Sequence, residues 1–132
     1  MAERSRDWLA QAERDLEEAR WSLKGGFYEW VCFISQQAAE KVVKGLFQAL
    51  HMEAWGHAVS KLLLNLPSDN LPPDELIYSA KRLDRFYIPP RYPNGFDSGA
   101  PKDYYNKEDA EESIADAEGI LVFCKNIILR SE

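Results

Sequence analysis

The sequence is poor in the residues that usually build metal and disulfide sites. Its 132 residues include two histidines and two cysteines, and the cysteines, Cys32 and Cys124, lie far apart inside apolar stretches. This arrangement has neither the spacing of zinc ligands nor the density of a disulfide framework. We therefore interpret both as buried thiols in a reducing cytosol. We expect no metal site and no cofactor.

Long apolar runs and a net positive charge are also missing. No stretch approaches the roughly 18 apolar residues that a membrane span needs. The beginning, MAERSRDW, is charged from its third residue, which is unlike a signal peptide. We therefore expect a cytoplasmic protein that does not enter a membrane. The net charge of −6 argues against a protein that coats nucleic acid non-specifically.

The composition instead indicates one folded helical domain, spanning residues 1–132. Hydrophobic residues make up 45% of the chain and aromatic residues 12%, which is enough for a core. Apolar residues recur every three or four positions, and no strand-like alternation is present. The pattern predicts an all-α bundle of about five helices. We expect three helices at residues 3–24, 27–52 and 57–66. A fourth should begin within 72–75 and end near residue 87, and a fifth should span 107–130.

The predicted helix at 27–52 is apolar around most of its circumference. Such a helix is either central in a bundle or also buried against a second subunit. Trp30 and Phe33 widen its apolar face, and they are our candidates for a dimer interface, although both could equally fill the core. The pattern therefore predicts a homodimer and leaves open which faces form it.

Basic residues concentrate around the proline-rich loop at 88–106. Residues 81–107 hold six Lys or Arg against three Asp, whereas 108–132 hold seven acids against two bases. Arginine grips phosphate with two hydrogen bonds, and tyrosine offers a face for a base. Alternatively, Asp84 and the acidic last helix pair with these arginines. The candidate nucleotide- or RNA-binding residues are Arg82, Arg85, Tyr87, Arg91, Tyr92 and Asn94.

Three stretches of the chain together resemble the HEPN family. They are the motif SQQAAEK at 35–41, Gly56-His57 followed by Leu62-Leu63, and LDRFYIPPRYPN at 83–94, after which come Tyr104-Tyr105 and the helix with EDAE at 108–111. The ordered set covers nearly the whole chain. The resemblance implies an up-down four-helix bundle with an additional short helix, usually a homodimer. It also implies a gene beside a minimal nucleotidyltransferase, as in a toxin–antitoxin-like pair.

Some HEPN proteins are metal-independent ribonucleases whose site is an arginine followed, four to six residues later, by a histidine. This sequence departs from that motif. Its histidines are His51 and His57, the nearest preceding arginine is Arg20, and Tyr87 stands where a histidine would follow Arg82. We interpret His57 as a structural or surface residue at the start of the short helix. The sequence favours a nucleotide- or RNA-binding interaction module, with a ribonuclease toxin that uses Arg82 or Arg85 and tyrosines as the alternative.

Overall fold

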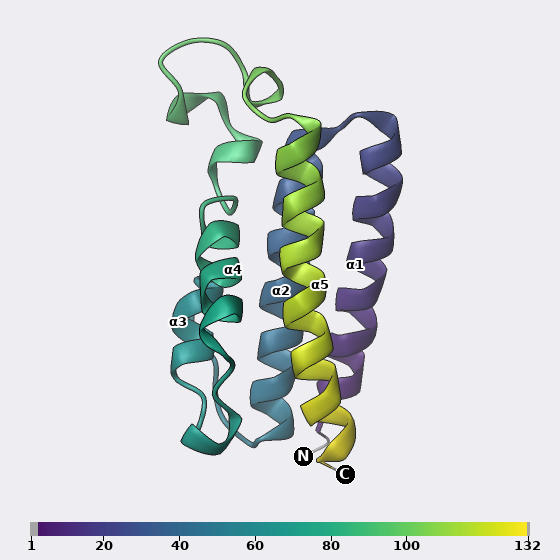
Figure 1. Cartoon of the computed structure of the whole chain (residues 1–132), viewed down its shortest axis with the longest axis vertical. Coiled ribbons are helices and arrows are strands. Elements are labelled where there is room, and N and C mark those ends of the chain that lie inside the picture. Colours follow the sequence, from purple (N-terminus) through teal and green to yellow (C-terminus); the bar gives the residue numbers. More distant parts are fainter. Residues whose placement is uncertain (1–2, 132) are drawn as a thin grey trace.

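The computed structural model describes residues 3–131, and helices form its whole framework. Four long helices alternate in direction along one bundle, and a short helix lies beside the third of them (Figure 1). This arrangement confirms the predicted all-α, up-down four-helix bundle with an additional short helix. The helices are α1 (Ser5–Gly25), α2 (Tyr28–Ala49), α3 (Val59–Leu64), α4 (Asp74–Asp84) and α5 (Lys107–Arg130).

Two glycines explain how α1 and α2 form a tight hairpin. Gly26 follows α1 with a left-handed φ of 80°, and its N–H donates to the Leu23 carbonyl, which closes the last turn. Further along α2, a Cβ on Gly45 would lie 2.8 Å from the Cβ of Trp8. The absence of a side chain at this position therefore lets the two helices approach closely.

Helix α2 is the central helix of the bundle. It packs against both α1 and α5, and in Figure 1 it runs behind α5 and between α1 and α4. Val31, Val42 and Leu46 are fully buried on it. Its broad apolar surface is therefore used mostly inside one chain. Both cysteines are buried and free, and burial raises the pKa of the Cys32 thiol to about 12 and also that of Cys124.

The segment between α2 and α3 differs from the sequence-based expectation. The second helix was predicted to end at residue 52 and the third to begin at residue 57. In the structure α2 ends at Ala49 and α3 begins at Val59. His51 has a φ of 58° and Gly56 a φ of 89°, and left-handed backbone at two positions interrupts any helix. His57 consequently lies in a non-helical segment, from which its side chain reaches α2.

The loop at 88–106 is folded and caps one end of the bundle (Figure 1). It contains three short 3₁₀ turns, and its Pro90 and Pro101 are buried. The ring of Phe96 stacks on Tyr104 with 4.1 Å between centroids. The turns are η2 (Pro89–Arg91), η3 (Pro93–Gly95) and η4 (Pro101–Asp103), and η1 (Ser68–Asn70) precedes α4. Within residues 3–131 no helix is both long and apolar enough to cross a membrane.

Candidate functional site

Arg91 lies among aromatic rings at the start of the folded loop. Its guanidinium carbon is 4.4 Å from the ring centroid of Phe33, 4.8 Å from that of Tyr87 and 5.4 Å from that of Tyr92. Its Nε donates to the Tyr87 carbonyl at 2.7 Å, which fixes the side chain. We call these four residues the Arg91 cluster. Within residues 3–131 Arg91 forms no salt bridge, and its guanidinium contacts ring faces and the Tyr87 carbonyl.

Arg82 occupies a different environment from Arg91. Its Nε and one terminal nitrogen donate to the two carboxylate oxygens of Asp116 on α5, at 2.9 and 2.8 Å. The Asp116 side chain is only 8% exposed, and hydrogen bonding to this carboxylate raises the pKa of the Arg82 guanidinium. For Arg82, therefore, the structure shows the ion pair with the acidic last helix, which was the sequence-based alternative to phosphate binding.

The remaining sequence-based candidates divide between the Arg91 cluster and the open surface. Tyr87 and Tyr92 belong to the cluster, and Tyr92 is half-exposed. Arg85 and Asn94 are exposed, and among the described residues their side chains take no part in the cluster. The fold thus brings together three of the six candidates, Tyr87, Arg91 and Tyr92.

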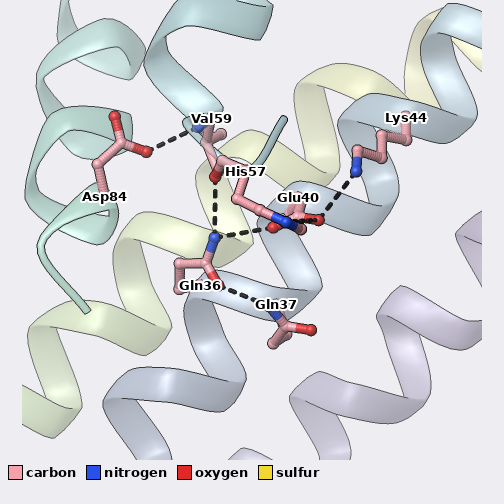
Figure 2. A network of polar contacts seen from close by, with 7 residues as sticks. All are labelled: Gln36, Gln37, Glu40, Lys44, His57, Val59 and Asp84. Atoms are coloured by element: carbon pink, nitrogen blue, oxygen red, sulfur yellow. Dashed lines mark hydrogen bonds and ion pairs between the residues drawn. The ribbon is translucent and has the colours of Figure 1, made fainter. Parts of the chain in front are cut away.

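A second group of polar side chains surrounds the carboxylate of Glu40 on α2 (Figure 2). Glu40 Oε2 lies 3.0 Å from Lys44 Nζ and 3.0 Å from His57 Nδ1, and Oε1 accepts from Gln36 Nε2 at 3.1 Å. The Glu40 side chain is 9% exposed and that of His57 is 51% exposed. A mostly buried carboxylate therefore holds an accessible imidazole in one orientation. Gln37 Nε2 donates to Gln36 Oε1 at 2.8 Å, and we call Gln36, Gln37, Glu40, Lys44 and His57 the Glu40 network.

Two further contacts fix the position of His57. Gln36 Nε2 donates to the His57 carbonyl at 3.1 Å. Asp84, at the end of α4, accepts from the backbone N–H of Val59 at 2.7 Å and of Ser60 at 3.3 Å, as Figure 2 shows for Val59. Asp84 thereby satisfies unpaired N–H groups at the start of α3, so α2 and α4 together set where the histidine lies.

Tyr87 joins the Arg91 cluster to the Glu40 network. The imidazole of His57 stacks on the Tyr87 ring with 4.3 Å between centroids and 17° between planes. The same ring lies 4.8 Å from the guanidinium carbon of Arg91. A histidine, an arginine and several aromatic faces thus meet on one surface, although they come from three separate parts of the chain.

Two other tyrosines stabilise the loop. The hydroxyl of Tyr104 donates to the Ser98 carbonyl, and Tyr105 packs edge-on against Phe86 and Phe96. Burial raises the pKa of Tyr105. No group of three or more His, Cys, Asp or Glu within residues 3–131 is arranged to hold a metal ion. The surface itself carries a guanidinium, an imidazole bound to a carboxylate, and several ring faces.

The fold and the surface define a small helical-bundle protein with an arginine–aromatic site next to a carboxylate-bound histidine. The chain belongs to the HEPN family, since the model of the HEPN domain matches residues 5–127. It is 32% identical over 130 residues to the protein named "Putative toxin MJ1304" of Methanocaldococcus jannaschii, an alignment that covers 92% of this chain and 86% of that protein.

Three solved structures share this fold. The TT1696 protein of Thermus thermophilus has a TM-score of 0.93 and 44% identity, covering 96% of this chain and 99% of that one. ST0689, an archaeal HEPN homologue, has a TM-score of 0.82 and 47% identity over the same shares. A HEPN domain protein of Thermotoga maritima has a TM-score of 0.77 and 40% identity, covering 94% and 98%.

The contact of His57 with Glu40 and Tyr87, near Arg91, was not predictable from the spacing of these residues in the sequence. Each of these residues lies in one of the three motifs that resemble the HEPN family, but they are separated by up to 51 positions. Their proximity depends on how the segment after α2 folds back, which periodicity does not report. The sequence did indicate that all four residues belong to motifs resembling the HEPN family. Those motifs did not indicate that the residues lie close together in space.

Proposed function

We propose that this HEPN protein binds a nucleotide or RNA at the Arg91 cluster and acts as an interaction module. The observation that carries the proposal is the guanidinium of Arg91, which has three ring contacts and no salt bridge within residues 3–131. Because Nε donates to the Tyr87 carbonyl and no carboxylate is paired, the terminal N–H groups of Arg91 stay available for a phosphate, and rings beside it can stack on a base. Arg82 lacks this capacity because Asp116 already accepts from it on both oxygens.

The charge of the chain limits the kind of binding. With a net charge of −6, long-range attraction of polyanions is weak, so affinity has to come from specific local contacts. Binding can be tested directly by titrating the protein with AMP and with a short RNA. We propose that Arg91, Tyr87 and Tyr92 make the principal contacts, and that exposed Arg85 and Asn94 border the site.

The same proposal includes a protein partner. A relative named as a toxin supports a role in a toxin–antitoxin-like pair, and the family resemblance suggests a minimal nucleotidyltransferase as the other member. We propose that residues 1–132 act as one HEPN domain in the cytoplasm. Residues 1, 2 and 132 of this range lie outside the described residues. Co-purification with a nucleotidyltransferase encoded by a neighbouring gene would support the pairing.

We further propose a homodimer with Trp30 in its interface. Trp30 is 43% exposed, whereas Phe33 is partly covered by Trp30 and Arg91 and so offers less free surface. Burying a large ring is a substantial part of an interface energy, and a charge in its place opposes association. Trp30→Glu should therefore change the solution mass from dimer to monomer, as measured by light scattering at micromolar concentration.

The matched control is Trp55→Glu, because Trp55 is 79% exposed and follows the opposite end of α2. This control should remain dimeric. A monomeric mass for the unmodified protein would remove the homodimer, and an unchanged dimer of Trp30→Glu would remove Trp30 from its interface.

Ribonuclease activity is the second candidate function, and the contact between His57 and Glu40 favours it. From the sequence, tyrosines were the candidates for the acid–base role, but an imidazole exchanges protons near neutral pH more readily. A carboxylate at Nδ1 leaves Nε2 for a ribose hydroxyl, and the Tyr87 ring contacts both His57 and the guanidinium of Arg91, which supplies donors for a phosphate. These groups would serve in place of the missing arginine–histidine motif.

The two candidate functions make opposite predictions for labelled RNA incubated in EDTA. We expect the RNA to remain intact on a gel, because binding is the better supported function. Cleavage that is lost in His57→Asn and kept in His51→Asn would instead identify a nuclease. His51 is the suitable control because it is exposed and its left-handed backbone, with a φ of 58°, tolerates asparagine.

A further inference from the structure

A pocket with two tryptophans adjoins the Glu40 network at the end of α2. Its volume is about 340 Å³, and it is lined by Trp8, Lys44, Gln48, Met52, Glu53 and Trp55, together with Ala54. Trp55 is 79% exposed in the non-helical segment that also carries His57, so its indole gains little from packing within the chain. An exposed indole beside a half-buried one suits a flat partner.

Lys44 belongs both to this pocket and to the Glu40 network. Its Nζ lies 3.0 Å from Glu40 Oε2, the oxygen that also contacts His57 Nδ1. His57 in turn stacks on Tyr87, whose ring lies 4.8 Å from the guanidinium carbon of Arg91. An unbroken series of side-chain contacts therefore leads from the tryptophan pocket to the Arg91 cluster.

The separation of the two ends sets the size of the ligand. Phe33 in the Arg91 cluster and Gln48 in the pocket are 15 residues apart on α2, which at the helical rise corresponds to about 22 Å. A mononucleotide is too short to touch both ends. From this geometry we propose that the site takes a single-stranded oligonucleotide, one base of which stacks in the tryptophan pocket while its backbone passes Lys44 and His57 toward Arg91. The proposal deepens the proposed function and depends on it.

The pocket lining favours a base over a purely apolar group. An aliphatic chain would cover Lys44, Gln48 and Glu53 without giving them hydrogen bonds, which costs free energy. A base has both a ring face for the indoles and polar edges for Glu53, for Gln48 Nε2 and for the remaining N–H donors of Lys44, since Gln48 Oε1 accepts from the Arg4 N–H and Lys44 donates to Glu40. Since Lys44 pairs with Glu40, and Lys41 with Asp15 at 2.6 Å, few net positive charges face the ligand. Stacking should therefore dominate, and the dependence of affinity on salt should be shallow.

The test measures binding of fluorescein-labelled oligoadenylates of two and eight nucleotides by anisotropy. The unmodified protein should bind the octanucleotide roughly ten-fold more tightly than the dinucleotide, because one additional stacked base contributes an affinity of that order. Trp55→Ala should lose this gain and Trp55→Phe should keep most of it. Trp21→Ala is the matched control, since Trp21 is 74% exposed but lies on α1 away from the pocket lining.

The outcomes separate this inference from the function on which it depends. The pocket is not a base subsite if the dinucleotide binds in an Arg91-dependent way and the octanucleotide binds no more tightly. The same conclusion follows if Trp55→Ala still binds the octanucleotide more tightly than the dinucleotide. If neither oligonucleotide nor AMP binds at all, both proposals fail. A deoxyadenylate octamer that shows the same Trp55-dependent gain identifies any single strand as the ligand, whereas a gain confined to RNA identifies contacts to the 2′-hydroxyl.

Discussion

Replacing Arg91 with alanine should weaken the binding of AMP or of a short RNA by about 10- to 100-fold, which corresponds to the loss of one charge-assisted hydrogen-bonded contact. The guanidinium has no salt bridge within residues 3–131, so its removal leaves no buried carboxylate unpaired. The loss of the ring contacts and of the hydrogen bond to the Tyr87 carbonyl should lower the melting temperature, but by less than in Arg82→Ala, which strands a buried carboxylate. Isothermal titration for binding and circular dichroism for the melting temperature would measure the two effects separately.

Arg82→Ala is the matched control, and it should behave in the opposite way. It removes both donors from Asp116, whose side chain is 8% exposed. Leaving this carboxylate without its partner costs about 1–3 kcal/mol, and each kcal/mol lowers the melting temperature by about 4 °C at this chain length. Ligand binding should remain. If Arg82→Ala abolishes binding while Arg91→Ala does not, the assignment of the site to the Arg91 cluster is wrong.

The alternative replacement Arg91→Lys separates charge from geometry. Lysine keeps the positive charge but has no planar fork, so it cannot stack on Phe33 and Tyr87 and donate two parallel hydrogen bonds at once. We expect it to recover only part of the lost affinity. Full recovery would mean that the site recognises charge alone.

Asp84→Ala should destabilise the protein by about 2–3 kcal/mol, because it leaves two backbone N–H groups at the start of α3 without an acceptor. The carboxylate accepts from Val59 N and Ser60 N, and also from the Ser60 hydroxyl. These bonds tie the end of α4 to the start of α3, as Figure 2 shows for Val59. Urea unfolding followed by circular dichroism would measure the change in the free energy of unfolding.

The same substitution should also affect the site. His57 lies two residues before Val59, so a loosened α3 should disturb the stacking of His57 on Tyr87 and reduce ligand binding. Asp84→Asn retains an oxygen acceptor and should lose about half as much stability. Equal stability of Asp84→Ala and the unmodified protein would contradict the role of Asp84 as the cap of α3.

The helices were predictable because their signals are local. The spacing of apolar residues predicted the last helix at 107–130, and α5 runs from Lys107 to Arg130. The first helix was predicted at 3–24, and α1 ends at Gly25, followed by Gly26 in the left-handed conformation that glycine adopts readily. The end of α2 was less predictable, since the apolar pattern continues to Met52 while the left-handed backbone at His51 ends the helix earlier. Periodicity does not report backbone dihedral angles.

The candidate site was predictable only in part. The cluster of arginines and tyrosines around residues 82–94 was visible as a basic segment, but Arg82 and Arg91 looked equivalent in it. The two arginines differ in which neighbouring helix their side chains face. Arg82 lies on the side of α4 that faces Asp116 on α5, whereas Arg91 follows α4 in a turn packed on α2. Which partner an arginine meets depends on the neighbouring helix, and this information is not in its own segment.

The all-α bundle and the buried cysteines could be predicted from the sequence, because composition and short-range spacing carry those signals, and the HEPN resemblance could be stated from the motifs at 35–41, 56–63 and 83–94. That Glu40, His57, Tyr87 and Arg91 share one surface, and that Trp55 and Lys44 line one pocket, depends on the packing in three dimensions. These residues meet because the non-helical segment after α2 folds back and Asp84 fixes the start of α3. Such long-range contacts depend on the packing of the whole bundle.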